Sequence, residues 1–281
     1  MIAADALADA IKVLNRAGVP DAPRDARKLL VDALGINPGR ISLILSDPMP
    51  IQAQKLFETH IAARSKRQPV AQIIGARAFY GRDFIVTPDV LDPRPDTETL
   101  IGVALQKSFE TVLDLGVGSG CILLTLLAER PHANGIGVDL SAAALNVARR
   151  NAQSLELQDR AQFQQSDWFE NITGLFDLIV SNPPYIAQSE MTDLSPDVRD
   201  WEPQMALTPG GDGLQPYRTI AAKAANHLTA NGCLIVEIGA SQGLAVQQIF
   251  QQQNLENIAI YTDLDGRDRV VSAKTGKKAQ V

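Results

Sequence analysis

Asn182-Pro183-Pro184-Tyr185 has the residue types best suited to chemistry, and it follows a strand-like run, residues 176–181. The Asn182 side-chain oxygen and the Pro183 carbonyl can each accept a hydrogen bond, and the prolines stiffen the backbone around them. Such a site can hold a planar NH2 group, and the Tyr185 ring can pack against a flat substrate. The motif predicts alkylation of an amide or exocyclic amine, although a proline turn that ends a strand is an equally frequent origin of this sequence.

A glycine loop lies upstream of this motif. Residues 111–115 have the pattern of a buried strand, and they lead into Gly116-Val117-Gly118-Ser119-Gly120 and an apolar helical stretch, residues 121–127. Glycines let a backbone approach a ligand closely, and a helix N-terminus offers unpaired N–H groups. A dinucleotide fingerprint has a sixth-position glycine where this chain has Cys121, which disfavours an NAD-dependent oxidoreductase.

Two further positions predict a nucleoside cofactor. The apolar residues 135–138 form a second strand pattern that ends at Asp139, about 20 residues beyond the glycine loop, where a carboxylate can bind both ribose hydroxyls. Trp168 and its neighbour Asp167 lie between Asp139 and the Asn-Pro-Pro-Tyr motif and can border an adenine. For these two residues, core packing and a turn are the more frequent roles.

Composition narrows the class of protein. The 281 residues and 45% hydrophobic content suit one sizeable core with a smaller second domain, and the net charge of -6 argues against broad contact with nucleic acid. The two cysteines and three histidines have neither disulfide nor metal-ligand spacing, so no metal is expected. Residues 1–10 lack a basic leader pattern, and no apolar run reaches membrane length, so we expect a cytoplasmic protein with no membrane contact.

The first part of the chain has helical patterning. Three helices are predicted: one with Leu7, Ile11 and Leu14 on one face, one over residues 25–34, and one over residues 51–67 with Leu56 and Ile61 inward. A bundle of this kind serves either as a cap on a larger domain or as a docking surface for a partner. The β-prone runs 70–74 and 84–86 then predict a hairpin linker.

The rest of the chain alternates strand and helix patterns, with strands over residues 232–238 and 258–262 and a helix over 243–253. We therefore expect a doubly wound, Rossmann-like α/β fold. The predicted domains are a helical bundle over 1–68, a β-hairpin linker over 69–92 and a catalytic domain over 93–281. Asp96 or Thr97 is expected to cap a helix that begins near Glu98, and residues 274–281 to form a solvated tail.

Taken together, Gly116-x-Gly118-x-Gly120, Asp139 and Asn182-Pro183-Pro184-Tyr185 resemble the class I S-adenosylmethionine-dependent methyltransferases that act on nitrogen. Pro93-Arg94-Pro95-Asp96-Thr97-Glu98 is similar to the signature of the HemK/PrmC family, the peptide chain release factor glutamine methyltransferases. Most of the chain takes part in the resemblance. Gln72 departs from it, since many relatives have an aromatic residue there.

The resemblance implies methyl transfer from S-adenosyl-L-methionine to the amide nitrogen of the glutamine in the Gly-Gly-Gln loop of class 1 peptide chain release factors. Open alternatives are a glutamine of ribosomal protein uL3, an adenine or guanine amine of a nucleic acid, and a non-catalytic cofactor-binding adaptor. A nucleic-acid substrate is not expected, given the acidic balance. The expected catalytic residues are Asn182 and Pro183, the substrate-binding residues Asn182, Pro183, Pro184 and Tyr185, and the cofactor-binding residues Gly116, Val117, Gly118, Ser119, Gly120, Asp139, Trp168 and Asn182.

Overall fold

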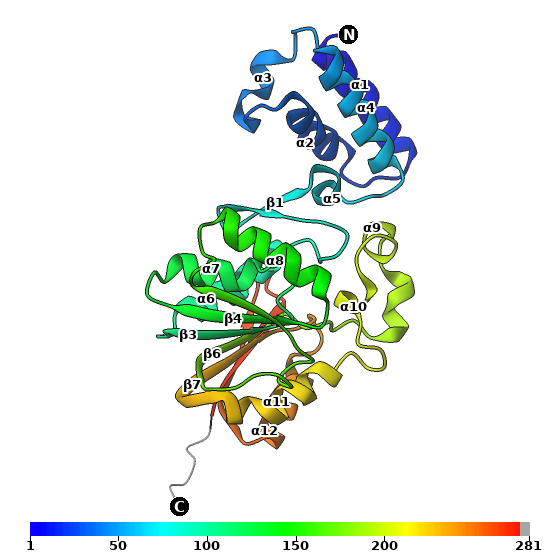
Figure 1. The fold of residues 1–281 in the computed structure, drawn as a ribbon. Helices are drawn as coiled ribbons and strands as arrows, with labels where there is room; N and C mark the ends of the chain where they lie inside the picture. Colours follow the sequence, from blue (N-terminus) through cyan, green and yellow to red (C-terminus); the bar gives the residue numbers. More distant parts are fainter. Residues whose placement is uncertain (276–281) are drawn as a thin grey trace, which may run out of the picture. The chain divides into compact units, whose positions relative to one another are not determined.

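The computed structural model describes residues 1–275 and divides into two compact units. Unit 1 comprises residues 1–76 together with the distant segment Ser195–Trp201, and unit 2 comprises residues 77–194 and the chain from Glu202 onward. Figure 1 shows the secondary structure elements of both. Among the described residues, no helix is both long enough and apolar enough to cross a membrane.

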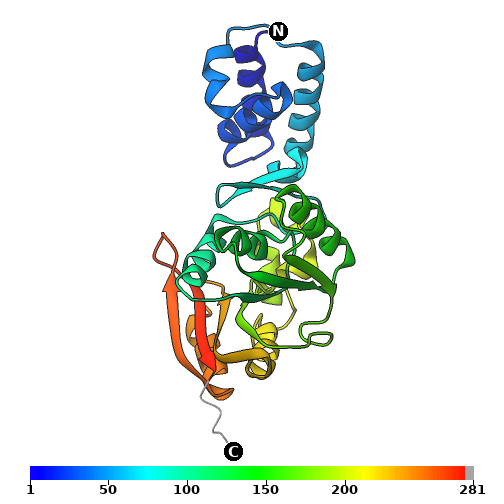
Figure 2. The same cartoon turned by 60° about the vertical axis from the view of Figure 1, so that its left-hand side comes forward.

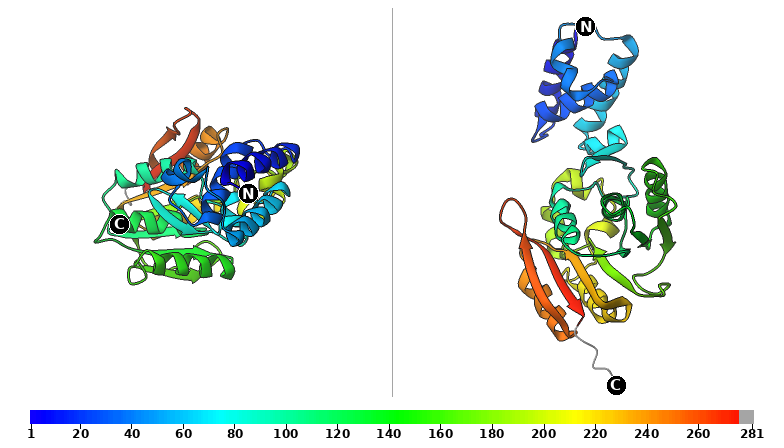
Figure 3. Two further views of the ribbon diagram at one scale, coloured as in Figure 1. Left: turned by 90° about the horizontal axis from the view of Figure 1, so that it is seen from above. Right: turned by 90° about the vertical axis from the view of Figure 1, so that its left-hand side faces the viewer.

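Unit 1 is helical (Figures 1 and 3). Its helices pack around one apolar cluster. Leu14, Leu29 and Leu30 are fully buried in that cluster. Two residues of the third predicted helix were predicted to point inward. Ile61 is buried, which confirms that part of the prediction, but Leu56 is 44% exposed and its neighbour Phe57 is buried instead. The elements are α1 (Ala3–Arg16), α2 (Ala22–Leu34), η1 (Pro38–Arg40), α3 (Ile41–Ile44), α4 (Ile51–Ser65), α5 (Val70–Ile74) and α9 (Pro196–Arg199).

The predicted hairpin forms, but its first strand lies elsewhere. Val70–Ile74 is the short helix α5, so the β assignment of these residues was wrong. The strands are β1 (Ala76–Phe79) and β2 (Arg82–Ile85), and the turn between them has positive φ at Tyr80 and Gly81. Such a turn matches the twist of two antiparallel strands. Pro69 lies immediately before the first residue of this helix. The strand prediction relied on the β-branched residues of the segment and took no account of this proline.

Polar side-chain contacts join the segment 195–201 to the rest of unit 1. Arg64 is 5% exposed, and its guanidinium binds Asp25 at 2.7 Å and Asp197 at 3.0 Å. Trp201 donates its indole N–H to the Lys66 carbonyl at 3.1 Å. Gln72, the residue that departs from the family pattern, donates to the Trp201 carbonyl at 3.0 Å. A piece of chain that comes after the Asn-Pro-Pro-Tyr motif is thus held by the helical unit.

Unit 2 is built on a seven-stranded sheet in the order β5-β4-β3-β6-β7-β9-β8. Its first five strands run parallel, and β9 pairs antiparallel with both β7 and β8. The β8–β9 hairpin, orange to red, forms one edge of the sheet (Figure 2). The strands are β3 (Thr111–Leu115), β4 (Asn134–Asp139), β5 (Ala161–Gln165), β6 (Phe176–Ser181), β7 (Leu228–Glu237), β8 (Leu255–Thr262) and β9 (Asp268–Thr275).

Helices cover both faces of this sheet, which gives two apolar layers and confirms the predicted doubly wound α/β fold. One layer packs Val112 of β3 and Val180 of β6 against α6 (Glu98–Leu105), α7 (Cys121–Glu129) and α8 (Ala142–Ser154). The other packs Leu113 and Ile179 of the same strands against α11 (Gln215–His227) and α12 (Gly243–Gln252). The elements η2 (Pro95–Thr97), η3 (Gln188–Asp193) and α10 (Gln204–Leu207) complete the unit.

Two sequence assignments need correction in unit 2. Lys274 was predicted to begin a solvated tail, but it pairs with Cys233 as part of β9; the rest of that predicted tail, beyond Thr275, lies outside the described residues. Neither Asp96 nor Thr97 caps α6 with its side chain, because residues 95–97 form a 3-10 turn that leads directly into the helix. The Thr97 side chain points to a different set of partners.

Candidate active site

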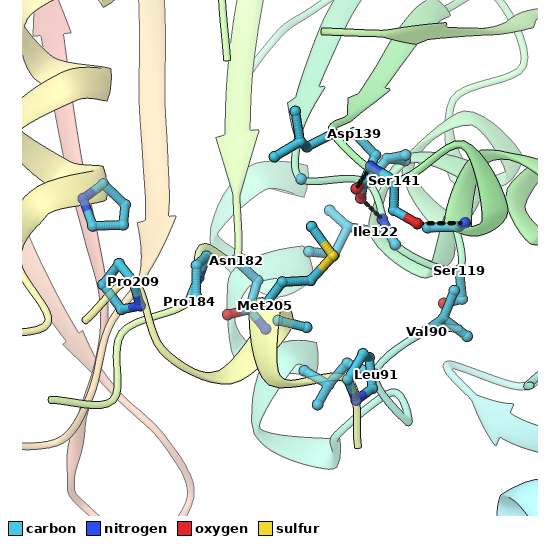
Figure 4. A pocket seen from close by; sticks show the side chains of 18 of the residues that line it. Val90, Leu91, Ser119, Ile122, Asp139, Ser141, Asn182, Pro184, Met205 and Pro209 are labelled. Carbon is cyan, nitrogen blue, oxygen red and sulfur yellow. Dashed lines mark hydrogen bonds between the residues drawn. The ribbon is translucent and has the colours of Figure 1, made fainter. Parts of the chain in front are cut away.

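A cavity of about 340 Å³ lies in unit 2 at the carboxyl ends of β3, β4 and β6. These three strands are neighbours in the sheet, so the residues that follow them meet at one edge. Figure 4 shows side chains around the cavity, with Asp139 and Asn182 among those labelled. Of the predicted site residues, Gly116, Val117, Gly118, Ser119, Asp139, Trp168, Asn182 and Pro184 line the cavity, whereas Gly120, Pro183 and Tyr185 are not among its lining residues.

The glycine loop turns back on the end of β4. The N–H groups of Gly116 and Val117 both donate to the Val138 carbonyl at 2.9 Å. Gly116 and Gly118 have φ angles of 74° and 53°, and a Cβ on either would meet no atom within 4 Å. The glycines are therefore required for the backbone conformation, and the space beside them is open to a ligand.

Two glycines within β4 let this loop lie close to the strand. A Cβ on Gly135 would come within 2.5 Å of Leu123, and one on Gly137 within 2.6 Å of Val117. Both neighbours belong to the loop or to the helix that it starts. The sequence pattern identified the strand, but the role of its glycines depends on contacts across the sheet.

Asp114, two residues before the loop, stabilises the helix that follows it. Its Oδ2 accepts from the Leu123 N–H at 3.2 Å, in the first turn of α7, and the side chain is fully buried. The residue before α7 is Gly120, which has no side chain to cap the helix. Burial raises the pKa of the Asp114 carboxyl to about 7. A carboxylate at this position also complements the positive end of the helix dipole.

Asp139 presents a pre-oriented carboxylate at the cavity wall. Its Oδ2 accepts from the Gly118 N–H and its Oδ1 from the Ser141 N–H, each at 2.9 Å (Figure 4). Burial raises the pKa of Asp139, and the donated backbone N–H groups act in the opposite direction. Both oxygens retain lone pairs, so they can accept further hydrogen bonds from a pair of hydroxyls.

Trp168 also lines the cavity, in a backbone conformation unusual for a bulky residue, with φ of 50°. The Ser166 hydroxyl donates to its carbonyl at 3.0 Å, which fixes the turn. Asp167 is exposed and lines the same part of the cavity. An aromatic face and a carboxylate beside Asp139 are suited to the base of a nucleoside whose ribose Asp139 binds.

The Asn-Pro-Pro-Tyr segment is anchored at both ends. The Asn182 side-chain nitrogen donates to the Thr97 hydroxyl at 3.4 Å, and the Tyr185 carbonyl accepts from the Gln242 side chain at 2.8 Å. The Tyr185 ring packs against the α11 and α12 layer, and its hydroxyl donates to Glu237 at 3.5 Å. The Tyr185 ring thus supports the segment through the core, and its predicted packing against the substrate stays a prediction.

Sequence reasoning did not assign a large part of the wall. It is contributed by residues 89–94, which precede η2, and by residues 203–209, around α10. Met205 is 51% exposed, and Figure 4 shows its side chain extending toward the middle of the cavity. Arg94 binds the buried Glu202 at 3.4 Å. Burial raises the pKa of Glu202 to about 7, which Arg94 opposes. Residues 89–94 and 203–209 overlap segments that resemble the family, and this overlap is the sequence signal that could have assigned them to the site.

The cavity fits a nucleoside cofactor with a charged sulfonium and an amino acid tail. The Asp139 carboxylate can accept from the hydroxyls of its ribose, and Trp168 offers an aromatic wall for its base. The open space over Gly116 and Gly118 can take its amino acid tail. Among residues 1–275, no group of three or more His, Cys, Asp and Glu side chains is placed to hold a metal ion. The fold and this site define a class I S-adenosylmethionine-dependent methyltransferase.

Comparison with known proteins narrows the class. Residues 5–75 match the PrmC N-terminal domain and residues 91–199 the methyltransferase small domain. A release factor glutamine methyltransferase of Cereibacter sphaeroides is 55% identical over 98% of this chain and 99% of its own, and one of Rhodospirillum rubrum is 45% identical over 93% and 81%. The chain belongs to the family of release factor glutamine methyltransferases.

Solved structures support the fold alone. The hMettl16 catalytic domain, in complex with a 3′UTR hairpin, superposes with a TM-score of 0.61 and 14% identity over 79% of this chain and 83% of its own. A methyltransferase from Pyrococcus furiosus has a TM-score of 0.55 and 14% identity over 78% and 98%.

Proposed function

We propose that this enzyme transfers a methyl group from S-adenosyl-L-methionine to the side-chain amide nitrogen of the glutamine in the Gly-Gly-Gln motif of class 1 peptide chain release factors. The observation that carries the proposal is the position of Asn182. It lies on the wall of the cavity that holds the nucleoside-binding residues, and its side-chain nitrogen is already bonded to Thr97. Its side-chain oxygen is left as an acceptor for an incoming NH2 group. Relatives at 55% and 45% identity are named for this activity.

The chain's part in the reaction is orientation. An amide nitrogen is a weak nucleophile because its lone pair is delocalised into the carbonyl. The Asn182 oxygen and the Pro183 carbonyl accept its two N–H groups and fix the nitrogen for attack along the line of the departing bond. When bound, S-adenosylmethionine supplies an electrophilic methyl carbon, whose bond to sulfur breaks as the bond to nitrogen forms. The nitrogen becomes acidic as it is alkylated and releases one proton to water.

The residues that bind the cofactor lie on the parts of the cavity wall away from Asn182. Asp139 accepts from the ribose hydroxyls, Trp168 borders the adenine, and the loop 116–120 leaves room for the amino acid tail. Apolar side chains such as Met205 exclude water from the place where the substrate and cofactor meet. Because the proposed substrate acts at the ribosome, the proposal also places the enzyme in the cytoplasm.

Replacement of Asn182 by Ala is expected to lower kcat about 100-fold, since it removes one of two pre-oriented acceptors at the reacting nitrogen. The measurement is single-turnover methyl transfer at saturating cofactor. Asn146→Ala is the matched control, because it makes the same substitution at an exposed position of α8 that does not line the cavity. An Asn182→Ala variant with the turnover of the wild type would contradict the role of this side chain.

The proposed substrate is tested by transfer of tritiated methyl groups to purified, unmodified class 1 release factor. A factor in which the Gly-Gly-Gln glutamine is replaced by Ala is the control. Label that depends on this glutamine supports the proposal. Ribosomal protein uL3, DNA and RNA are assayed side by side, and label on one of these in place of the release factor would overturn it. Tight binding of the factor with no transfer to any acceptor would indicate an adaptor.

A further inference from the structure

An asparagine side chain presents different chemistry on its two sides. Its oxygen accepts hydrogen bonds, and its NH2 group donates them. A substrate NH2 group can be held only by the oxygen, so a half-turn of the Asn182 amide would replace an acceptor by a donor and repel the substrate. Some part of the chain has to fix which side faces the cavity.

Thr97 is the neighbour that makes this choice. It is 2% exposed, and its hydroxyl oxygen lies 3.4 Å from the Asn182 side-chain nitrogen. A hydroxyl has a single proton to donate. If that proton is used elsewhere, only the lone pairs of Thr97 remain for Asn182, and lone pairs select the NH2 side of the amide.

Glu237 is the acceptor placed to take the Thr97 proton. It stands at the end of β7 and is 1% exposed, its Oε2 has no hydrogen-bond donor among the described residues, and the nearby Thr97 hydroxyl acts against the rise in its pKa. The same carboxyl accepts from the Tyr185 hydroxyl at 3.5 Å. The charged residues Arg269 and Asp96 act on it from β9 and η2. Above its pKa of about 7 the carboxyl is ionised and has no proton to offer, so the hydroxyls of Thr97 and Tyr185 can only donate to it.

We propose that Thr97 and Glu237 are positioning residues for methyl transfer: Glu237 directs the Thr97 hydroxyl proton away from Asn182, and Thr97 thereby holds the Asn182 amide with its oxygen toward the substrate. The inference rests on the proposed function of the cavity. It assigns a role to a threonine of the Pro93-to-Glu98 segment that precedes Asn182 by 85 residues. Neither residue is proposed to touch the reacting atoms.

The first test compares Thr97→Val with Thr97→Ser. Valine keeps the shape of threonine but has no hydroxyl, and serine keeps the hydroxyl. Thr97→Val is expected to lower kcat about 10- to 100-fold, with the KM for the release factor changed less than about 3-fold, because docking is intact and the amide is free to turn. Thr97→Ser is expected to stay within about 3-fold of the wild-type kcat. Binding of S-adenosylmethionine, measured by calorimetry, confirms that each variant is folded.

The second test removes Asn182 first. If Thr97 acts only through Asn182, then Thr97→Val has little left to change in an Asn182→Ala background, and its effect on kcat shrinks to less than about 3-fold. A threonine that merely stabilises the fold would lower kcat by the same factor in both backgrounds. That additive result, or full activity of Thr97→Val alone, overturns the inference.

The two proposals fail in different ways. If the wild-type enzyme labels no release factor, the proposed function fails before any Thr97 variant is made. If the wild type labels the glutamine and Thr97→Val does so equally fast, the function stands and the positioning role is refuted.

Discussion

The Asp139 carboxylate has a separate contact for each oxygen before any ligand arrives. Gly118 and Ser141 hold it from the glycine loop and from the start of α8, so little ordering remains when hydroxyls bind. Hydrogen bonds to a charged group contribute about 1.5–3 kcal/mol each. The position was predicted from the sequence because a carboxylate at the end of the second strand has few other uses.

Asp139→Ala is expected to raise the Kd for S-adenosylmethionine about 10- to 100-fold, since two charge-assisted acceptors are lost. Asp139→Asn keeps one acceptor and the side-chain volume, so its Kd should lie between those of the wild type and the alanine variant. Isothermal titration calorimetry measures both. An alanine variant that binds as tightly as the wild type would remove Asp139 from the ribose site.

Glu237 links the stability of unit 2 to pH. Burial raises its pKa from the ordinary value of 4.5 to about 7, with Thr97, Arg269 and Tyr185 acting in the opposite direction. A carboxyl whose pKa is higher in the folded state binds a proton more tightly there. Its contribution to stability is therefore complete below about pH 4.5 and is lost as the pH rises through 7.

Glu237→Gln has no group to titrate at this position. Between pH 5 and pH 8 the wild type should lose stability relative to the variant, by on the order of 3 kcal/mol at most. Urea unfolding at a series of pH values gives the difference between the two proteins. Parallel stability curves would show that the carboxyl titrates alike in the folded and unfolded states.

The residues proposed to touch ligands could be predicted from the sequence, and those proposed to orient them could not. Asn182, Asp139 and the glycine loop follow strands directly, so their proximity could be inferred from the order of elements. Thr97 meets Asn182 across 85 positions and Glu237 meets Tyr185 across 52, and local patterns carry no information on such contacts.

At the scale of elements, the chain after the Asn-Pro-Pro-Tyr motif is held by a glycine-rich loop. The Ile186 N–H donates to the Leu207 carbonyl at 3.0 Å, and the Gln188 N–H to the Gly211 carbonyl at 3.0 Å. Gly213 packs directly against the backbone of this segment. A Cβ there would lie 2.3 Å from the Tyr185 carbonyl oxygen and 3.1 Å from the Ala187 nitrogen, so only glycine fits. The loop therefore fixes the position of the whole motif.

Gly213→Ala is expected to displace this segment and to lower kcat at least about 10-fold, along with the thermal midpoint. Gly210→Ala is the matched control. Gly210 has a φ of 79°, close to the 75° of Gly213, but a Cβ on it meets no atom within 4 Å. The control thus carries the backbone strain, about 1–2 kcal/mol, without the collision. Equal activity of the two variants would argue against the close contact.

Hydrophobic periodicity predicted the helices and the parallel strands because burial on one or two faces sets those patterns. It failed where the secondary structure of a segment depends on its contacts with other parts of the chain. Val70–Ile74 is rich in β-branched residues yet is helical, and β9 was taken partly for a tail although it lies between β7 and β8. A strand that pairs antiparallel at the end of a parallel sheet cannot be recognised from its own residues.

At the scale of the whole molecule, Asp197 joins two distant parts of the chain within unit 1. Its carboxylate binds Arg64 and Arg67, and these guanidinium groups together lower its pKa although burial acts in the opposite direction. Removal of one partner from a buried ion pair leaves the other charge without compensation, which is costly. Asp25 remains as a second partner for Arg64 and moderates the loss.

Asp197→Ala is expected to destabilise unit 1 by about 2–3 kcal/mol. The loss should be seen as faster amide hydrogen exchange in α2 and α4, with exchange in β3 and β6 unchanged. Asp200→Ala is the control, because the Arg199–Asp200 pair is 44% and 50% exposed, and ion pairs in water contribute little to stability. Equal protection of the helices in both variants would mean that the segment 195–201 adds nothing to unit 1.

The discontinuity of unit 1 also limits how this chain can be recombined with its relatives. An exchange of gene segments at residue 77 would join one parent's helices to another parent's residues 195–201, and the partners of Arg64 and Gln72 would then come from different ancestors. The helical unit keeps its native contacts only if residues 1–76 and residues 195–201 come from the same parent. Changes at Arg64 and Asp197 are therefore expected to occur in concert, although more than 100 residues, most of them catalytic sequence, separate the two.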